Sequence, residues 1–226
     1  MPDPIIYTCA QGSREWIRAR LGRPTSSCFG RIITPKTMEP SSQADRYLAQ
    51  LIAEWALALP VVDEFSTAAI ERGRMLEPRA RAWYAVAYDA DVTEVGGVTD
   101  AEGRYWTSTD GLVGEDGILE VKTPLAIGHV QNMLNPHDIA DATQVQGGLW
   151  VTGRQWCDMI SYNPELPNVV QRVERDPEWM EAFDEVMPKF SRRLETLKEE
   201  LAEKYGLTAP DLSGPPSWSH TPEVDG

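Results

Sequence analysis

Two acidic residues and a lysine in the middle of the chain have the spacing of a hydrolytic centre. Asp110 is followed by Glu120, and Lys122 lies two positions beyond it. The stretch 118–122, Ile-Leu-Glu-Val-Lys, is expected to form a strand, in which side chains alternate between the two faces. Glu120 and Lys122 therefore share a face. The turn at 114–117, which begins and ends with glycine, would fold the chain back and place Asp110 opposite Glu120.

Two carboxylates that converge on one point repel each other unless a cation lies between them. Such oxygen-rich sites suit Mg²⁺ or Mn²⁺, and the ion can clamp a phosphate and stabilise a leaving oxygen. A lysine beside the acids can orient an attacking water, so the pattern indicates phosphodiester hydrolysis. The alternative is a chance match, with Asp110 in a turn and Glu120 and Lys122 as a surface pair. The isoleucine and leucine before Glu120, and the valine after it, favour a buried strand.

Elements on both sides of this strand must position the acids. Further strands are expected at 91–98, 104–109, 155–162 and 168–174. Helices are expected at 13–21, 25–33, 66–87, 125–134, 138–150 and 176–205, and another after Ser41-Ser42. Gly73 and Pro78 are expected to make the helix at 66–87 irregular or broken near Glu77, and Pro188 to kink the last helix. This order predicts one α/β (α+β) domain over residues 1–206, a central mixed sheet flanked by helices. The proline-rich stretch 207–226 is expected to be a disordered tail.

The composition is that of an ordinary soluble protein, with 226 residues, 42% of them hydrophobic and 25% charged. Three scattered cysteines exclude a disulfide framework and a four-cysteine zinc site, and they suit a reducing cytosol. No apolar run is long enough for a membrane helix, and the N-terminus lacks the pattern of a secretory signal. A cytoplasmic protein without membrane association is therefore expected.

The charge of the chain is strongly negative but unevenly distributed. A net charge of −14 argues against nucleic acid as a partner, because phosphate binding normally uses a basic surface. Between Arg14 and Lys36, however, there are six basic residues and one acid. This basic segment can bind an anion, and the alternative interpretation is a solvated helix face.

Short motifs are spread along the chain in collinear order within residues 12–206. The segments are 16–22, 25–27, 73–78, 107–114, 119–124, 143–153, 156–164, 173–176 and 182–188. Together they resemble the YqaJ-like viral recombinase family, which includes alkaline exonucleases of the phage lambda type. Each motif alone is weak, whereas the set is highly specific.

The resemblance implies a restriction-endonuclease-like PD-(D/E)xK core that uses Mg²⁺ or Mn²⁺. It assigns catalysis to five residues: Asp110, Glu120, Lys122, Gln144 and Glu77. Of these, Asp110 and Glu120 would also bind the metal, together with the backbone carbonyl of Val121. The pocket for a 5′-phosphate falls on Arg20, Ser27 and Ser108. The chain departs from the family pattern at Thr109, where the signature has proline, and at Gly128, where a basic residue can stand. The roles of Asp100 and His129 stay open.

The resemblance also implies a substrate, a product and partners. The substrate would be linear double-stranded DNA with 5′-phosphorylated ends, degraded 5′→3′ to leave a 3′ single-stranded overhang for phage-type homologous recombination. A single-strand annealing protein would be a partner, and three copies would form a homotrimeric ring. Two alternatives remain: an endonuclease of the same superfamily, and a non-catalytic DNA-binding or assembly module. The intact set Asp110, Glu120 and Lys122 argues against the latter.

Overall fold

Two β-sheets organise the chain in the computed structural model, which describes residues 3–61 and 68–210. A three-stranded antiparallel sheet has the order β1-β3-β4, with β1 at Ile5–Tyr7, β3 at Gly97–Thr99 and β4 at Trp106–Thr107. A five-stranded sheet has the order β2-β5-β6-β7-β8, with strands at Val92–Thr93, Gly111–Val113, Gly117–Lys122, Trp156–Ser161 and Val169–Glu174.

The larger sheet is mixed, as the sequence predicts. Its central strand β6 pairs antiparallel with β5 and parallel with β7. A parallel pair needs a long crossover, and here the crossover consists of three helices: α4 (Ala126–Leu134), the 3₁₀ helix η2 (Pro136–Ile139) and α5 (Ala142–Thr152). The β5–β6 hairpin and this crossover together decide which residues surround the end of β6.

Helices cover both faces of β6. On one face, Leu76 and Ala80 of α3 (Ala68–Ala87) belong to the same buried cluster as Leu119. On the other face, Val145 of α5 clusters with Ile118. Burial on both faces explains why β6 is almost continuously apolar, and it makes Glu120, only 5% exposed, an exception that needs a reason.

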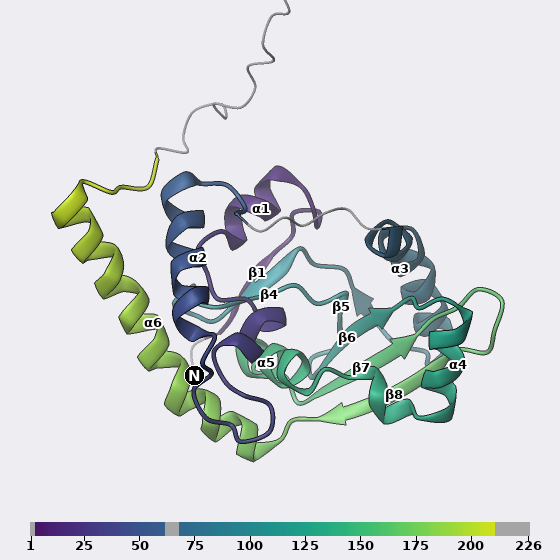
Figure 1. Ribbon diagram of the computed structural model, residues 1–226. Coiled ribbons are helices and arrows are strands. Elements are labelled where there is room, and N and C mark those ends of the chain that lie inside the picture. The colour runs from purple at the N-terminus through teal and green to yellow at the C-terminus, as the bar shows by residue number, and fades with distance from the viewer. Residues whose placement is uncertain (1–2, 62–67, 211–226) are drawn as a thin grey trace, which may run out of the picture.

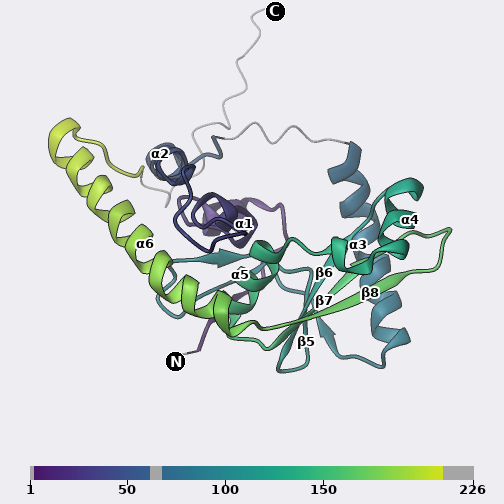
Figure 2. The same cartoon turned by 60° about the horizontal axis from the view of Figure 1, so that its bottom comes forward.

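A second layer of helices packs beyond α5. It consists of α1 (Arg14–Arg20), the 3₁₀ helix η1 (Ser26–Arg31), α2 (Ala44–Leu57) and the long α6 (Pro177–Tyr205). Phe29 of η1 is fully buried there, with its ring centroid 5.6 Å from that of Phe183 in α6. Figures 1 and 2 both show α2 and α6 together on one side of the molecule and α3 and α4 on the other.

One expected strand differs from the structure, and one observed strand was not expected. The stretch 91–98 is not one strand, because β2 joins the large sheet and β3 joins the small one. Between them Gly96 passes so close to the backbone of Cys9 that a β-carbon there would lie 2.1 Å from the Cys9 carbonyl oxygen. The small sheet includes β1, which the sequence pattern did not predict because three residues are too few to show an alternation.

The helix that was expected to be irregular or broken near Glu77 is continuous. α3 runs without interruption through Pro78, although a proline removes one helical hydrogen bond. The buried residues Leu76 and Ala80 flank Pro78 and hold both halves of α3 against the sheet. The expected helix 138–150 is instead divided into η2 and α5, because the Asp141 side chain caps α5 by accepting from the backbone N–H of Gln144 at 3.1 Å.

The C-terminal boundary was expected after residue 206. Gly206 ends α6 in the left-handed conformation, with φ of 68°. Leu207 is half-buried and packs against the cluster of η1, α2 and α6, and residues 207–210 have no regular structure. The rest of the expected tail, 211–226, lies outside the described residues. Among the described helices, none has the length and apolarity needed to cross a membrane.

Candidate active site

The β5–β6 hairpin holds Asp110 against the central strand. The backbone N–H of Asp110 donates to the carbonyl of Leu119 at 2.9 Å, and its Oδ2 accepts from the backbone N–H of Val121 at 2.6 Å. These two bonds fix the carboxylate of Asp110 beside the strand that carries Glu120. The convergence expected from strand alternation and a glycine turn is therefore present in the structure.

Gln144 links the acid and the lysine of β6. Its Nε2 donates to Glu120 Oε2 at 3.2 Å, and its Oε1 accepts from Lys122 Nζ at 3.4 Å. Gln144 lies in the first turn of α5, where the Asp141 cap determines how the helix begins. Glu120, Lys122 and Gln144 thus form one chain of polar contacts on the α5 face of the sheet.

Glu77 reaches the same region from α3. Burial raises the pKa of Glu77, whereas the charges of Arg81, Arg74 and Lys122 lower it. A β-carbon built on Gly73 would lie 3.2 Å from Glu77 Oε1, so the carboxylate folds back along its own helix. Glu77 therefore lies within electrostatic reach of the acids, although no hydrogen bond joins it to them among the described contacts.

Arg81 is a site residue that the sequence interpretation missed. It lies one helical turn after Glu77, its Nη1 donates to the backbone carbonyl of Asp110 at 2.8 Å, and its Nη2 pairs with Glu94 at 2.7 Å. Gln11 acts similarly from the N-terminal segment, with Nε2 donating to the carbonyl of Thr109 at 2.9 Å. Both residues fix the backbone at Asp110. The position of Arg81 four residues after Glu77 was the available signal.

The electrostatics of the two acids fit a bound cation. Burial raises the pKa of Asp110, and the nearby charge of Glu77 raises it further. Burial and the charge of Asp110 raise the pKa of Glu120. Burial and mutual repulsion make it unfavourable for both carboxylates to be ionised together, and a bound hard divalent ion would relieve this repulsion.

The backbone supplies a further oxygen at this point. In an antiparallel ladder, a residue directs its N–H and C=O toward the same neighbouring strand. The Val121 N–H is directed toward Asp110, so the Val121 carbonyl faces that side as well. Among the described residues, no three His, Cys, Asp or Glu side chains are grouped as a metal site. Asp110, Glu120 and the Val121 carbonyl would be completed by water and substrate phosphate, which Mg²⁺ often retains as ligands.

The raised pKa of Glu120 predicts a pH-dependent stability of the metal-free protein. A carboxyl whose pKa is higher in the folded state stabilises the fold fully below its ordinary pKa, and this contribution is lost as pH rises through the folded value. We expect Glu120→Gln to raise the Tm of the metal-free protein by roughly 3–8 °C at pH 9 and by much less at pH 5. Calorimetry in chelator measures this difference.

The matched control for this stability prediction is Glu181→Gln on the exposed surface of α6. It removes the same charge without relieving any burial and should leave Tm within about 1 °C at both pH values. A Tm increase for Glu120→Gln that is equal at pH 5 and pH 9 would contradict the prediction.

The three residues expected to bind a 5′-phosphate lie on adjacent segments but do not share one cavity. The Arg20 guanidinium lies over the Trp16 ring, 4.5 Å from its centroid, and lines a cavity of about 160 Å³ with Arg23, Arg31 and Arg74. The two serines, Ser27 and Ser108, are not among the residues that line it.

Both serines nevertheless connect to this region. Ser27 is exposed, and its hydroxyl is 3.3 Å from that of Thr25, which lines the Arg20 cavity. Ser108 accepts from Trp106 Nε1 at 2.7 Å, and Trp106 forms a backbone bridge with Thr25. A phosphate-binding role for Arg20, Ser27 and Ser108 stays a prediction.

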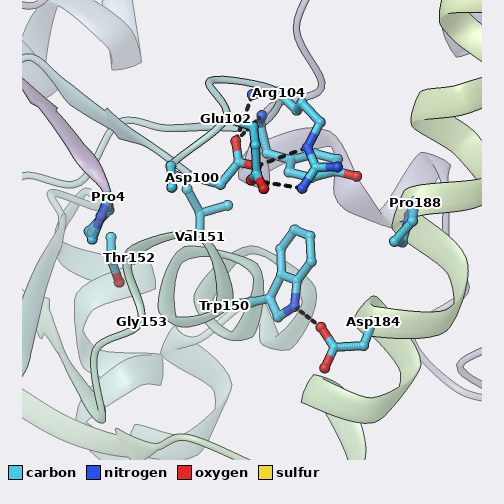
Figure 3. Close-up of a pocket in the computed structure, with 12 residues that line it drawn as sticks. Pro4, Asp100, Glu102, Arg104, Trp150, Val151, Thr152, Gly153, Asp184 and Pro188 are labelled. Atoms are coloured by element: carbon cyan, nitrogen blue, oxygen red, sulfur yellow. Dashed lines mark hydrogen bonds and ion pairs between the residues drawn. The ribbon is translucent and has the colours of Figure 1, made fainter. Parts of the chain in front are cut away.

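The structure places Asp100 away from the catalytic acids. Its Oδ1 accepts from the backbone N–H groups of Arg104 and Tyr105 at 2.6 and 2.9 Å, so it orders the turn before β4. Figure 3 shows Asp100 beside Arg104 in a pocket that also contains Trp150 and Asp184. This pocket of about 220 Å³ includes neither Asp110 nor Glu120.

His129 has a structural position. Its ring is fully buried, with Nδ1 2.8 Å from Ser161 Oγ and Nε2 3.0 Å from the Pro167 carbonyl oxygen. Both ring nitrogens are therefore engaged between α4 and the sheet. His129 cannot replace the basic residue that the family can carry at Gly128 without breaking these contacts.

Comparisons with known proteins agree with this fold. The described chain has the PD-(D/E)xK fold of alkaline exonucleases. An alkaline exonuclease (LHK-Exo) from Laribacter hongkongensis superimposes with a TM-score of 0.72 at 32% identity, over 86% of this chain and 98% of that chain. The same enzyme in complex with dAMP gives a TM-score of 0.70 at 33% identity over the same shares.

Sequence comparison shows the family of this chain. The model of the YqaJ-like viral recombinase domain matches residues 15–155, and the chain belongs to this family. A phage-related exonuclease from Haemophilus somnus 129PT shares the fold, with a TM-score of 0.59 at 14% identity over 79% of this chain and 96% of that chain. No curated protein is a significant sequence match.

Proposed function

We propose that the protein is a Mg²⁺-dependent 5′→3′ exonuclease that degrades one strand of linear double-stranded DNA and leaves a 3′ single-stranded overhang for recombination. The observation that carries the proposal is the joint placement of Asp110, Glu120, Lys122 and Gln144 around the end of β6. The 32% identical relative is an alkaline exonuclease, which supports the same reaction class.

Each residue has a role that follows from its contacts. Asp110, Glu120 and the Val121 carbonyl would hold Mg²⁺ (or Mn²⁺), which when bound supplies positive charge for the phosphate and the leaving oxygen. Lys122 and Gln144 orient the attacking water, because their polar atoms meet beside Glu120. Glu77 assists from α3, and Arg81 keeps the backbone of Asp110 in register.

The proposed reaction is tested with two forms of one duplex. An exonuclease degrades the linear form and leaves a covalently closed circle intact, whereas an endonuclease of the same superfamily also cuts the circle. A non-catalytic module cuts neither form. End-labelled linear DNA then gives the polarity, since 5′→3′ degradation releases a 5′ label first and preserves a 3′ label.

We expect Arg20→Ala to slow degradation of 5′-phosphorylated ends more than that of 5′-hydroxyl ends, by roughly 10-fold or more. A guanidinium can donate two hydrogen bonds to one phosphate, and this contact exists only when the terminal phosphate is present. Single-turnover rates on the two substrates measure the ratio. An equal loss on both would mean that Arg20, which also packs on Trp16, has a structural role.

The proposed assembly is a homotrimeric ring that acts with a single-strand annealing protein. A chain of net charge −14 has weak long-range attraction to DNA, and a ring would retain DNA by enclosure if the basic segment lined its channel. A closed cyclic assembly also leaves no free interface. Native mass spectrometry should give three times the chain mass of 25.2 kDa, and processive degradation should persist in excess trap DNA. A monomer that dissociates after each cleavage would contradict the ring.

A further inference from the structure

Two arginines of α3, Arg74 and Arg79, are exposed, and neither makes a hydrogen bond or ion pair with any described residue. Of the two, Arg74 lines a cavity. Its neighbours on the same helix are engaged: Arg72 donates to the carbonyls of Thr123 and Pro124, and Arg81 donates to that of Asp110. The Arg74 guanidinium therefore has its donors available to a ligand.

Arg74 lies at the Arg20 cavity and near the acid Glu77. It lines the same cavity as Arg20, and its Nη2 is 3.8 Å from where a β-carbon on Gly12 would lie. The adjacent Gln11 donates to the carbonyl of Thr109, immediately before Asp110. The Gly12 backbone thus connects the Arg20 cavity with the segment that carries Asp110, and Arg74 lies against it.

The other side of Arg74 faces Glu77. The two residues are three positions apart on α3, so their side chains are neighbours on the helix surface. The charge of Arg74 opposes the effect of burial on the Glu77 pKa, which is consistent with this proximity. One cation therefore lies near both the cavity assigned to the terminal phosphate and Glu77, the acid of α3 assigned to hydrolysis.

The first nucleotide of a 5′-phosphorylated strand has two phosphates, one at its 5′ side and one at its 3′ side. The Arg20 cavity is assigned to the first phosphate and the acids to the second. We propose that Arg74 binds the second, scissile phosphate, an inference that rests on the proposed exonuclease function. A guanidinium matches two phosphate oxygens, and it stabilises the negative charge that increases there in the transition state.

The reaction step explains why a cation is useful at this position. The oxygen of water forms a bond to phosphorus, and the bond from phosphorus to the 3′ oxygen of the first nucleotide breaks. The water loses a proton and the 3′ oxygen gains one. The shortened strand then carries the cleaved phosphate as its new 5′-phosphate, which must move to the Arg20 cavity. Arg74 lies at the Arg20 cavity and near Glu77, so it can stay hydrogen-bonded to the phosphate during this transfer.

Single-turnover cleavage of 5′-phosphorylated and 5′-hydroxyl duplexes tests the proposal. We expect Arg74→Ala to lower the cleavage rate by roughly 10- to 100-fold. The factor should be the same for 5′-phosphorylated and 5′-hydroxyl duplexes. Arg74→Lys should recover part of the loss, since it restores the charge but not the paired donors. A loss confined to phosphorylated ends would overturn the proposal and assign Arg74 to the terminal-phosphate cavity.

The matched control is Arg79→Ala. Arg79 is also exposed, so its replacement removes the same charge from the same helix. It lies five residues after Arg74, which places it about 140° away around the helix axis. Arg79→Ala should stay within about twofold of the wild-type rate. An Arg74→Ala rate equal to that of Arg79→Ala would also overturn the proposal.

A binding measurement separates this proposal from the proposed function. If the wild type leaves linear duplex intact, the exonuclease proposal fails, and Arg74 is then judged by affinity in Ca²⁺ for a duplex whose first linkage is a neutral methylphosphonate. Neutralising that linkage should weaken binding of the wild type more than that of Arg74→Ala, because a double-mutant cycle gives non-additive losses for a direct contact. Independent losses would refute the contact.

Discussion

Alanine at Asp110, Glu120 or Lys122 is expected to lower the rate of DNA hydrolysis by roughly 1,000-fold or more while the fold persists. Asp110 and Glu120 supply both side-chain carboxylates of the proposed metal site, so either substitution removes half of them. Lys122 contacts Gln144, which in turn contacts Glu120, so its loss disturbs the water position rather than the metal. Steady-state and single-turnover assays on linear duplex measure the effect.

Glu115→Ala is the matched control for these substitutions. Glu115 is exposed in the same β5–β6 hairpin, so its replacement changes the charge without touching the site. The Glu115 variant should retain wild-type activity. Melting curves for all four variants establish that each is folded, and appreciable turnover by folded Asp110→Ala would refute the assignment of this site.

We expect Mg²⁺ and Mn²⁺ to restore activity to the chelated protein and Ca²⁺ to leave it inactive. Ca²⁺ binds the same oxygen ligands, but it tolerates longer bonds and looser geometry than the octahedral Mg²⁺. We therefore expect Ca²⁺ to retain DNA on the protein without cleavage and to inhibit the Mg²⁺-dependent reaction. Rates with each ion, together with DNA retention in Ca²⁺, measure the prediction.

Stability provides a readout of metal binding that does not depend on catalysis. Mg²⁺ should raise the Tm of the wild type at alkaline pH, because it relieves the repulsion between Asp110 and Glu120. It should raise the Tm of Glu120→Gln much less, since one of the two charges is already absent. Full activity in chelator, or equal rates in Mg²⁺ and Ca²⁺, would exclude the proposed metal dependence.

Part of the site could be predicted because it follows from local backbone geometry. Strand alternation places Glu120 and Lys122 on one face, and a turn bounded by glycines returns the chain to Asp110. Neither argument needs any residue outside the hairpin. The mixed sheet and most helices also follow from periodicity, which was correct for α4, β7 and β8 within one or two residues.

Residues that meet the site from distant segments were not accessible to the same reasoning. Gln144 is 24 positions from Glu120, and only the family resemblance indicated it. Arg74 and Arg81 lie on one helix, yet packing turns Arg81 toward the Asp110 carbonyl and leaves Arg74 beside Gly12. Asp100 and His129 were open candidates, and their hydrogen bonds are to the β4 turn and to β7.

The sequence by itself determined the acid-lysine pattern, the mixed α/β class and the uneven distribution of charge, since each depends on composition or on spacing within a single element. Tertiary structure alone decided that α3 continues through Pro78, that residues 92–99 divide between two sheets, and that α3 and α5 place Glu77 and Gln144 on either side of β6. The physical reason is that burial of apolar faces outweighs local propensity. Which side chains are buried together depends on the whole chain.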